Sequence, residues 1–451
     1  MAHTLEFGSV SITFQWHNYV ALAILSAVVI LSLSRIWRAR LPHNGDVPTR
    51  SDDLSGSSEK KAPKPLRYGS GKLEGGAWDA KGPGYLPDPD PLSNLDLSTA
   101  SVRDYVYVNK VLRYPYFQTM AHQPMHINDW IEIDREYKWY LDEKARVIRE
   151  QGISVAGADP GKVVIDSLPE NDAACTELLE TLADYLPKRF PTMFDAIYDN
   201  PSEPAIGIVN KVTGESFPDV RTLSGVDALL AVSRLVQDDF LMGRERPDGK
   251  IYLVGGLIVF PGSYLLSEKI GQPLHELHGS VPHFNKMLMS VERTMARFAP
   301  DRPFERASWM IVDDRELFWH NIISGTMPAD MHPKDLFLRI DHQTFRKLPK
   351  TRGIMFGVHP VLKRIGDLAD SPLVPALLAK IHTEADRELM GYKKSEKYTG
   401  VLVPYLQKLT EQQIAKGLVS RKVYLMLVLL SKRPDDVEEA AMFREQANMT
   451  T

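Results

Sequence analysis

Cysteine is almost absent from this chain of 451 residues, which contains one, Cys175. A single thiol cannot form an internal disulfide, a four-cysteine zinc site or an iron–sulfur cluster held by this chain alone. It also fits a reducing compartment for most of the protein. Cys175 lies in an apolar helical pattern, which favours a core position over a nucleophile.

Net charge is nearly absent as well, because 54 Lys and Arg oppose 58 Asp and Glu. Such a balance gives no electrostatic footprint for nucleic acid, so we expect no nucleic-acid partner. The sequence contains no serine nucleophile elbow, dinucleotide fingerprint or kinase signature. The 43% of hydrophobic residues nevertheless indicates a globular protein with a sizeable core.

Long apolar runs are rare too, and the first one, residues 19–34 (YVALAILSAVVILSLS), carries no charge. Trp16 and Trp37 bracket it at a separation of roughly 32 Å of helix, which is close to the thickness of a bilayer core. Lys and Arg begin at Arg35. The pattern predicts a membrane anchor over residues 19–37 with the body facing the cytosol, at the endoplasmic reticulum or another organelle membrane. A cleaved signal peptide and a buried helix are the alternatives.

The predicted anchor divides the chain into segments. We expect a non-cytosolic tail over residues 1–18, a Pro/Gly/Ser-rich linker over 38–96, a body over 97–436 and a C-terminal tail over 437–451. Periodicity in the body predicts helices first, then strands mixed with helices, and a helical C-terminal part. This order indicates an α+β fold. The predicted helices span 128–149, 172–185, 228–242, 281–297, 372–389, 400–416 and 418–430, and the predicted strands 205–213, 251–260, 306–313 and 336–341.

Histidine, by contrast, is plentiful, since eight of the 13 lie between His275 and His382. Three fall in GQPLHELHGSVPH (271–283), where Gly and Pro indicate an irregular loop between a strand and a helix. His275 and His278 are three residues apart, so on a helix they share a face and could bind a metal. The alternative is three surface histidines in a polar loop.

A second dense group is RIDHQT (339–344). On a strand, Arg339, Asp341 and Gln343 would share one face, and His342 would lie on the other. Arg, Asp and Gln on one face could orient a carboxylate, a propionate or an amine. A half-exposed strand with a salt bridge is the alternative.

Six blocks in order resemble one family, the haem-dependent oxidative N-demethylase-like, or HRQ, family. With the anchor, the chain resembles a membrane-anchored, fungal-type member. The resemblance implies a PAS-like α/β haem-binding fold and oxidative removal of a methyl group from a small secondary amine with dioxygen. The blocks are MAHQPMHINDWIEIDREY (120–137), LPKRFP (186–191), RLVQDDF (234–240), LHELHGSVP (274–282), SW (308–309) and LRIDHQTFRKLP (338–349).

The resemblance also implies site residues. The histidine of the family's I-H-x-P-V-P block falls on His278, which we predict as the iron ligand, with His275 as the alternative. Arg339 and Gln343 fall in the family's Arg-x-x-Arg-Gln-Thr block and would hold haem propionates or order the pocket. Asp341 is a candidate for orienting the amine. His342 stands where bacterial members carry Arg, and could be a distal base, alter propionate pairing or be neutral.

Dioxygen chemistry at haem needs electrons, and this chain lacks the cysteines and the fingerprint for its own flavin or iron–sulfur centre. We therefore expect a separate flavin or iron–sulfur reductase as a partner. Two other functions stay open: a haem sensor or carrier without catalysis, and a non-haem metal enzyme that uses His275, His278 and His283.

Overall fold

A computed structural model gives the fold. It describes residues 3–7, 10–14, 86–102, 111–154, 163–262, 265–325, 327 and 330–429. The chain divides into two units, Met1–Lys72 and Leu73–Thr451. In the first, β1 (His3–Phe7) pairs antiparallel with β2 (Val10–Phe14). The predicted anchor over 19–37 lies outside the described residues, and so does the predicted tail over 437–451. Among the helices that the structure describes, none has the length and apolar character to cross a bilayer.

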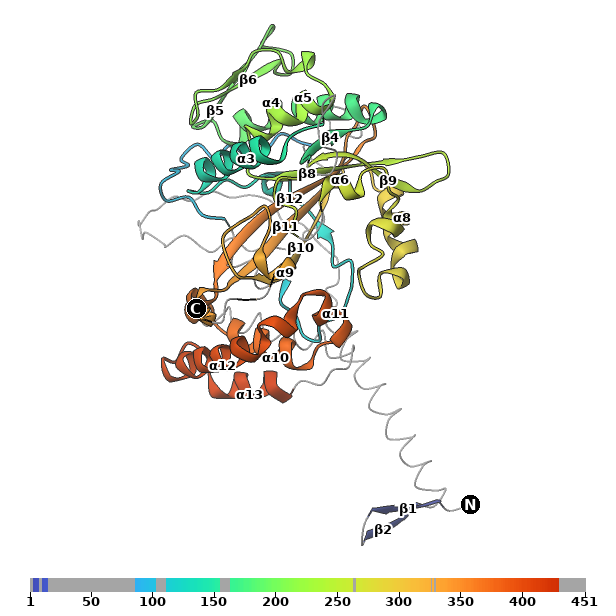
Figure 1. The fold of residues 1–451 in the computed structure, drawn as a ribbon, viewed down its shortest axis with the longest axis vertical. Coiled ribbons are helices and arrows are strands. Elements are labelled where there is room, and N and C mark those ends of the chain that lie inside the picture. Colours follow the sequence, from blue (N-terminus) through green and yellow to red (C-terminus); the bar gives the residue numbers. More distant parts are fainter. Residues whose placement is uncertain are drawn as a thin grey trace, which may run out of the picture. The chain divides into compact units, whose positions relative to one another are not determined.

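The second unit is built on a seven-stranded sheet in the order β3-β10-β11-β12-β8-β9-β4, with every neighbouring pair antiparallel. The longest pair, β11 and β12, lies in the middle of the sheet, as Figure 1 shows. This mixture of antiparallel sheets and helices confirms the predicted α+β class. The strands are β3 (Gln123–Pro124), β4 (Ile165–Ser167), β8 (Asp239–Glu245), β9 (Ile251–Leu257), β10 (Phe304–Val312), β11 (Phe337–Lys347) and β12 (Ile354–Arg364).

Helices and a small second sheet surround these strands. The last four described helices form the helical C-terminal part that the sequence predicts, gathered together in Figure 1. A three-stranded sheet contains β5 (Phe194–Ile197), β6 (Gly207–Asn210) and β7 (Ser216–Phe217). The helices are α3 (Tyr137–Gln151), α4 (Asp172–Arg189), α5 (Gly225–Ser233), α6 (Leu266–Lys269), α7 (Leu274–Leu277), α8 (Leu288–Arg297), α9 (Asn321–Ser324), α10 (Val374–Glu384), α11 (Arg387–Tyr392), α12 (Thr399–Ala415) and α13 (Arg421–Leu429).

The two faces of the large sheet differ in what covers them. Phe304, Phe345 and Phe356 lie in register across β10, β11 and β12, and their rings stack at centroid distances of 4.6 and 4.5 Å. They pack in one apolar cluster with residues of α7 and α8. On the other face, Ile340 of β11 packs in a cluster with the C-terminal helices. We call these two surfaces the Phe345 face and the Ile340 face.

Several predicted elements need correction, and the largest error concerns residues 228–242. Helix α5 ends at Ser233, and β8 begins at Asp239. Phe240 and Met242 are fully buried there, because β8 is an inner strand between β12 and β9. A strand covered on both faces has few polar alternations, so its sequence resembles that of a buried helix.

Helix boundaries were wrong in other places as well, and the single helix predicted over 372–389 is two helices, α10 and α11. The helix predicted from residue 128 begins at Tyr137, because Trp130 and Ile131 are buried in an irregular segment before it. The helix predicted to stop before Pro187 continues to Arg189, with the proline in its last turn. The helix predicted over 281–297 begins at Leu288, since His283 has a left-handed backbone (φ 62°) that interrupts it.

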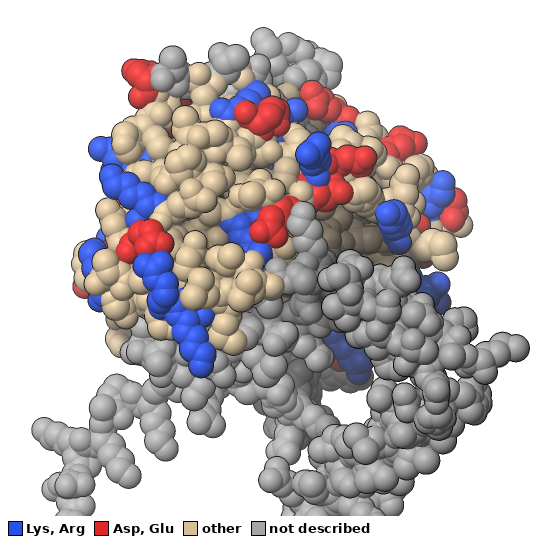
Figure 2. Space-filling model, turned by 90° about the horizontal axis from the view of Figure 1, so that it is seen from below, with Lys and Arg blue, Asp and Glu red and all other residues tan. Residues whose placement is uncertain are grey.

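The end of the predicted linker lies on the body. Leu86, Leu92 and Leu95 pack against the main core, and the Leu92 amide donates to the Arg189 carbonyl at 2.7 Å. Residues 38–85 lie outside the described part of the chain. On the face drawn in Figure 2, acidic and basic side chains are interspersed over the described surface and do not separate by sign. Charge on this face therefore gives no single-sign patch for a partner.

Candidate functional site

His278 ends the short helix α7, in the segment between β9 and α8. Its Nδ1 lies 3.0 Å from the Leu274 carbonyl one turn earlier, and its ring stacks on Phe284 at 4.2 Å with the two planes 10° apart. No hydrogen-bond partner of its Nε2 is found among the described residues. The carbonyl favours the tautomer protonated at Nδ1, which leaves Nε2 as a free lone pair held in a fixed orientation.

The surroundings of His278 keep it neutral. Burial lowers the pKa of His278, and the positive charges of Arg306 and Lys269 lower it further, against the opposing effect of the Leu274 hydrogen bond. A neutral imidazole is the form that binds a metal. The geometry and the pKa direction therefore both suit a ligand with one nitrogen available.

Arg306 of β10 and Arg113 lie near each other, and no carboxylate partner of either is found among the described residues. The Nε of each is buried and has no hydrogen-bond partner in the part of the chain that the structure describes. Burial lowers the pKa of Arg306 to about 10, and the charge of Arg113 contributes to that shift. Arg113 makes a cation–π contact with Phe117 at 5.7 Å. The Arg306–Arg113 pair is therefore a concentration of positive charge with capacity for an anion.

Gln343 and Asp341 lie on the same face of the sheet as Arg306. Gln343 is directly opposite Arg306 in the β10–β11 register, and Asp341 is opposite Ser308. The Gln343 Nε2 donates to the Ser308 Oγ at 3.1 Å. The alternation predicted for 339–344 is confirmed, since this strand runs without a bulge through all six residues.

Arg339, further along the same face, is already fully engaged. It is 1% exposed, and its Nε donates to Asp341 at 2.9 Å. Its Nη2 donates to the Phe260 carbonyl at 2.8 Å, and its Nη1 to the His320 Nε2 at 3.1 Å and the Leu317 carbonyl at 3.5 Å. Binding a propionate would require Arg339 to release these partners, so its predicted role stays a prediction that this geometry does not favour.

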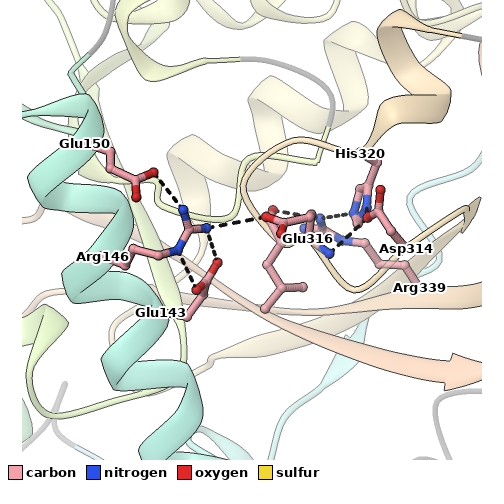
Figure 3. A network of polar contacts seen from close by, with 8 residues as sticks. Glu143, Arg146, Glu150, Asp314, Glu316, His320 and Arg339 are labelled. Atoms are coloured by element: carbon pink, nitrogen blue, oxygen red, sulfur yellow. Dashed lines mark hydrogen bonds and ion pairs between the residues drawn. The ribbon is translucent and has the colours of Figure 1, made fainter.

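Figure 3 shows the network around Arg339. A guanidinium can only donate, so the His320 Nε2 accepts and its Nδ1–H donates to Asp314 at 2.9 Å. Burial lowers the pKa of His320 and Arg339 adds to this, against the Asp314 hydrogen bond. On the other side of the same view, Arg146 of α3 donates to Glu316, which lies in the segment that carries His320. The network fixes this segment against the sheet.

His342 lies on the opposite face. It is buried, and its Nε2 lies 2.9 Å from the Glu305 carboxylate. Directly across the strand pair is His359, whose Nδ1 lies 3.2 Å from Asp238. The sheet therefore separates His342 from the face that carries Gln343 and Asp341, as strand alternation predicts, so these two candidate residues do not meet.

The histidine-rich loop does not assemble a three-histidine site among the described residues. Its His283 is grouped instead with Asp386 and Glu388, and the other described group with metal-ligand potential is Asp313, Asp314 and His320. Neither group contains His275, whose nearest charged neighbour is Glu276 at 3.8 Å. The geometry does not favour the non-haem alternative built on His275, His278 and His283.

A polar cavity of about 600 Å³ lies elsewhere in this unit and contains none of the predicted site residues. Two of its arginines are already paired, Arg315 with Glu136 at 2.8 Å and Arg364 with Asp335. Its lining includes Tyr140, whose hydroxyl donates to the Pro360 carbonyl at 2.7 Å. Paired charges of both signs give this cavity no clear preference for one ligand chemistry.

Sequence reasoning missed Arg306, Arg113 and His320. Within the predicted strand 306–313, nothing distinguishes Arg306 from an ordinary exposed charge, and Arg113 is distant from Arg306 in the sequence. The long-range β10–β11 pairing brings Arg306 opposite Gln343. The usable signal was that alternation in residues 304–308 (FERAS) puts an arginine on the face of Phe304.

These residues fit haem. An imidazole with a carbonyl-bound Nδ1 and an available Nε2 is the donor that a haem iron takes. Two guanidinium groups with buried Nε atoms, and no carboxylate partner among the described residues, match the carboxylates of the porphyrin, which Arg binds well. The fit rests on atoms that are otherwise left without partners, His278 Nε2 and the two Nε atoms of Arg306 and Arg113.

Comparison with known families agrees with this chemistry. The family described as haem-dependent oxidative N-demethylase, alpha subunit-like, matches residues 121–403. The match covers more than half of the chain and includes His278 and the whole of β11. The chain belongs to the haem-dependent oxidative N-demethylase alpha-subunit-like family.

Proposed function

We propose that this protein is a haem-dependent oxidoreductase that removes a methyl group from a small amine, with His278 as the iron ligand. The observation that carries the proposal is the His278 ring, fixed by the Leu274 carbonyl and by Phe284, with Nε2 left available. Haem, when bound, supplies the redox chemistry with dioxygen. The overall reaction consumes dioxygen, two electrons and two protons, and yields the demethylated amine, formaldehyde and water.

The chain's own groups would hold and orient the reactants. A methylated amine is protonated at neutral pH, and Asp341 is a carboxylate on the Phe345 face with 16% of its side chain exposed. The Arg339 Nε holds that carboxylate in place at 2.9 Å. Asp341 would thus bind the ammonium group, and Gln343, held by Ser308, would order the wall beside it.

Electrons would come from a separate flavin or iron–sulfur reductase. Cys175 is not a redox centre on this view, because burial raises the pKa of its thiol to about 12 and the Asn171 side chain donates to its sulfur at 3.1 Å. We also propose a membrane anchor over residues 19–37 that keeps the body on the cytosolic side. The Trp-bracketed apolar run and the arginines after it support this, and tethering near a membrane-bound reductase would raise its effective concentration.

The visible spectrum of the full chain tests the ligand. We expect an intense Soret band in the wild type and its loss or a marked shift in His278→Ala. His275→Ala is the matched control, because it lies in the same short helix, three residues earlier, with 35% of its side chain exposed. An unchanged Soret band in His278→Ala would overturn the assignment.

Turnover tests the activity. The haem-loaded protein, reduced under air with dimethylamine, should release formaldehyde. An intact Soret band without formaldehyde, with dimethylamine and with other small methylated amines, would point to a haem sensor or carrier in place of an enzyme.

A further inference from the structure

Three arginines of the large sheet differ in what neutralises them: Arg339 and Arg346 are buried, and Arg306 is partly buried with a buried Nε atom. Arg339 has a carboxylate, a histidine and two carbonyls as partners. Arg346, on the Ile340 face, lies over the Trp130 ring at 3.9 Å, although its Nε and Nη1 also have no hydrogen-bond partner among the described residues. Arg306 has neither a carboxylate nor an aromatic face among the described residues, and a second cation, Arg113, is close enough to lower its pKa.

This arrangement is unfavourable unless an anion is present. A buried ion without a partner loses its hydration, and a second like charge adds repulsion. Burial lowers the pKa of Arg306 to about 10, so at neutral pH its guanidinium still carries its charge. A carboxylate that reaches both groups would supply acceptors for the unpaired Nε atoms and cancel the repulsion between Arg306 and Arg113.

The position of Arg306 and Arg113 limits which anions could bind them. His278 stacks on Phe284, which packs in one apolar cluster with Phe304. Arg306 lies two residues from Phe304 on the same strand face, directly opposite Gln343. An anion held by the pair would therefore lie on the face of the sheet that carries the proposed iron ligand. Two molecules could supply a carboxylate at this position. One is haem, through its propionates, and the other is an amine substrate that also carries a carboxylate.

We propose that Arg306 and Arg113 form the carboxylate-binding pair of this site, the role that the sequence had suggested for Arg339. The proposal rests on the proposed function, because it assumes that His278 and Arg306 line one ligand site. It assigns to Arg339 the different task of holding Asp341 and His320 in place. The pair binds its carboxylate through charge-assisted hydrogen bonds, so the loss of either partner should weaken the same interaction.

A comparison of haem with its dimethyl ester distinguishes a propionate from a substrate carboxylate as the group that binds the pair. The ester keeps the iron and the ring but has no charged propionate. The affinity of the full chain for each is measured by Soret titration in the wild type, Arg306→Gln and Arg113→Gln. If propionates bind the pair, esterification weakens binding to the wild type by about tenfold or more, and Arg306→Gln weakens haem by a similar factor. Esterification should then change the affinity of Arg306→Gln by less than about threefold, since the partner is already missing.

Arg346→Gln is the matched control, because Arg346 is also buried, with a pKa lowered to about 10, but on the other face. Esterification of haem should weaken its binding to Arg346→Gln by the same factor as its binding to the wild type. Arg113→Gln removes the other member of the pair and lies outside the sheet strands, so it keeps the test valid if Arg306→Gln does not fold.

A second arm tests the substrate source with N-methylglycine and dimethylamine, each titrated into the haem-loaded protein and followed by the Soret shift. If esterification costs the same in the wild type and Arg306→Gln, but the variant loses affinity for N-methylglycine alone, the pair binds a substrate carboxylate. Equal esterification cost with no loss for N-methylglycine would overturn the proposal. A wild type that binds no haem at all would instead refute the proposed function.

Discussion

Arg339 and Arg306 lie on the same face of one sheet, on neighbouring strands, yet their surroundings are opposite. Around Arg339, every partner comes from the chain itself, from Asp341, His320 and two backbone carbonyls. Around Arg306, the described chain offers a second cation and no acceptor for its Nε. A buried polar group with its partners inside the chain belongs to the framework, whereas one without them indicates a place for a ligand.

The largest effect should come from removing the paired arginine. Arg339→Met leaves Asp341 and His320 without their buried donor, and loss of one partner of a buried pair costs about 3–5 kcal/mol. We expect a loss of that size in the free energy of unfolding, measured by urea denaturation. Arg339→Lys, which keeps one charge but not the fork of donors, should recover only part of the loss. A variant with wild-type stability would show that the Arg339 network does not support the fold.

The next largest effect is a pH dependence of the free energy of unfolding that comes from His320, beside Arg339. Because the folded pKa of His320 is lowered, its neutral form contributes stability that is fully present above its unfolded pKa of about 6.5. That contribution is lost as pH falls from there through the folded pKa, at about 1.4 kcal/mol per pH unit. His320→Gln keeps an acceptor for Arg339 and a donor for Asp314 but does not titrate. Urea denaturation between pH 7.5 and 5 should therefore show a shallower slope for His320→Gln, and equal slopes would contradict the assignment.

The two ends of the face also differ in how well sequence predicts them. Alternation within β11 placed Arg339, Asp341 and Gln343 together and His342 opposite, because the side-chain period of a strand is local information. The likeness of the His278 block to its family is local as well, and the family match includes it. Both predictions needed only neighbouring residues.

The rest depends on distant pairing. No short-range pattern brings Arg113 towards Arg306, or His320 onto Arg339, since each contact joins separate elements. The misassigned strand at Phe240 has the same cause, because its burial on both faces follows from strands β12 and β9 beside it. Local sequence patterns therefore predicted which side chains share a strand face, but not which arginine of the Phe345 face lacks a partner for its Nε among the described residues.

A smaller effect tests whether Asp341 belongs to the framework or to the ligand site. Asp341→Asn keeps an oxygen acceptor for the Arg339 Nε, so we expect the free energy of unfolding to fall by only about 1 kcal/mol. If Asp341 orients the amine, the same change should weaken dimethylamine binding about tenfold or more, measured by the Soret shift of the haem-loaded protein. Loss of stability without loss of amine affinity would assign Asp341 to the framework alone.

The smallest effect on stability should come from Arg306, although its Nε is buried on the same face of the sheet. Arg306→Gln removes a cation with no carboxylate partner in the described chain, so the full chain freed of haem should keep its free energy of unfolding within about 1 kcal/mol. Urea denaturation beside Arg339→Met measures the contrast directly. Haem added back should stabilise the wild type more than Arg306→Gln, because at a given concentration the stabilisation by a ligand grows with the logarithm of its affinity. If Arg306→Gln destabilises the haem-free chain as much as Arg339→Met does, then the chain itself supplies a partner to Arg306, and the two ends of this face do not differ in kind.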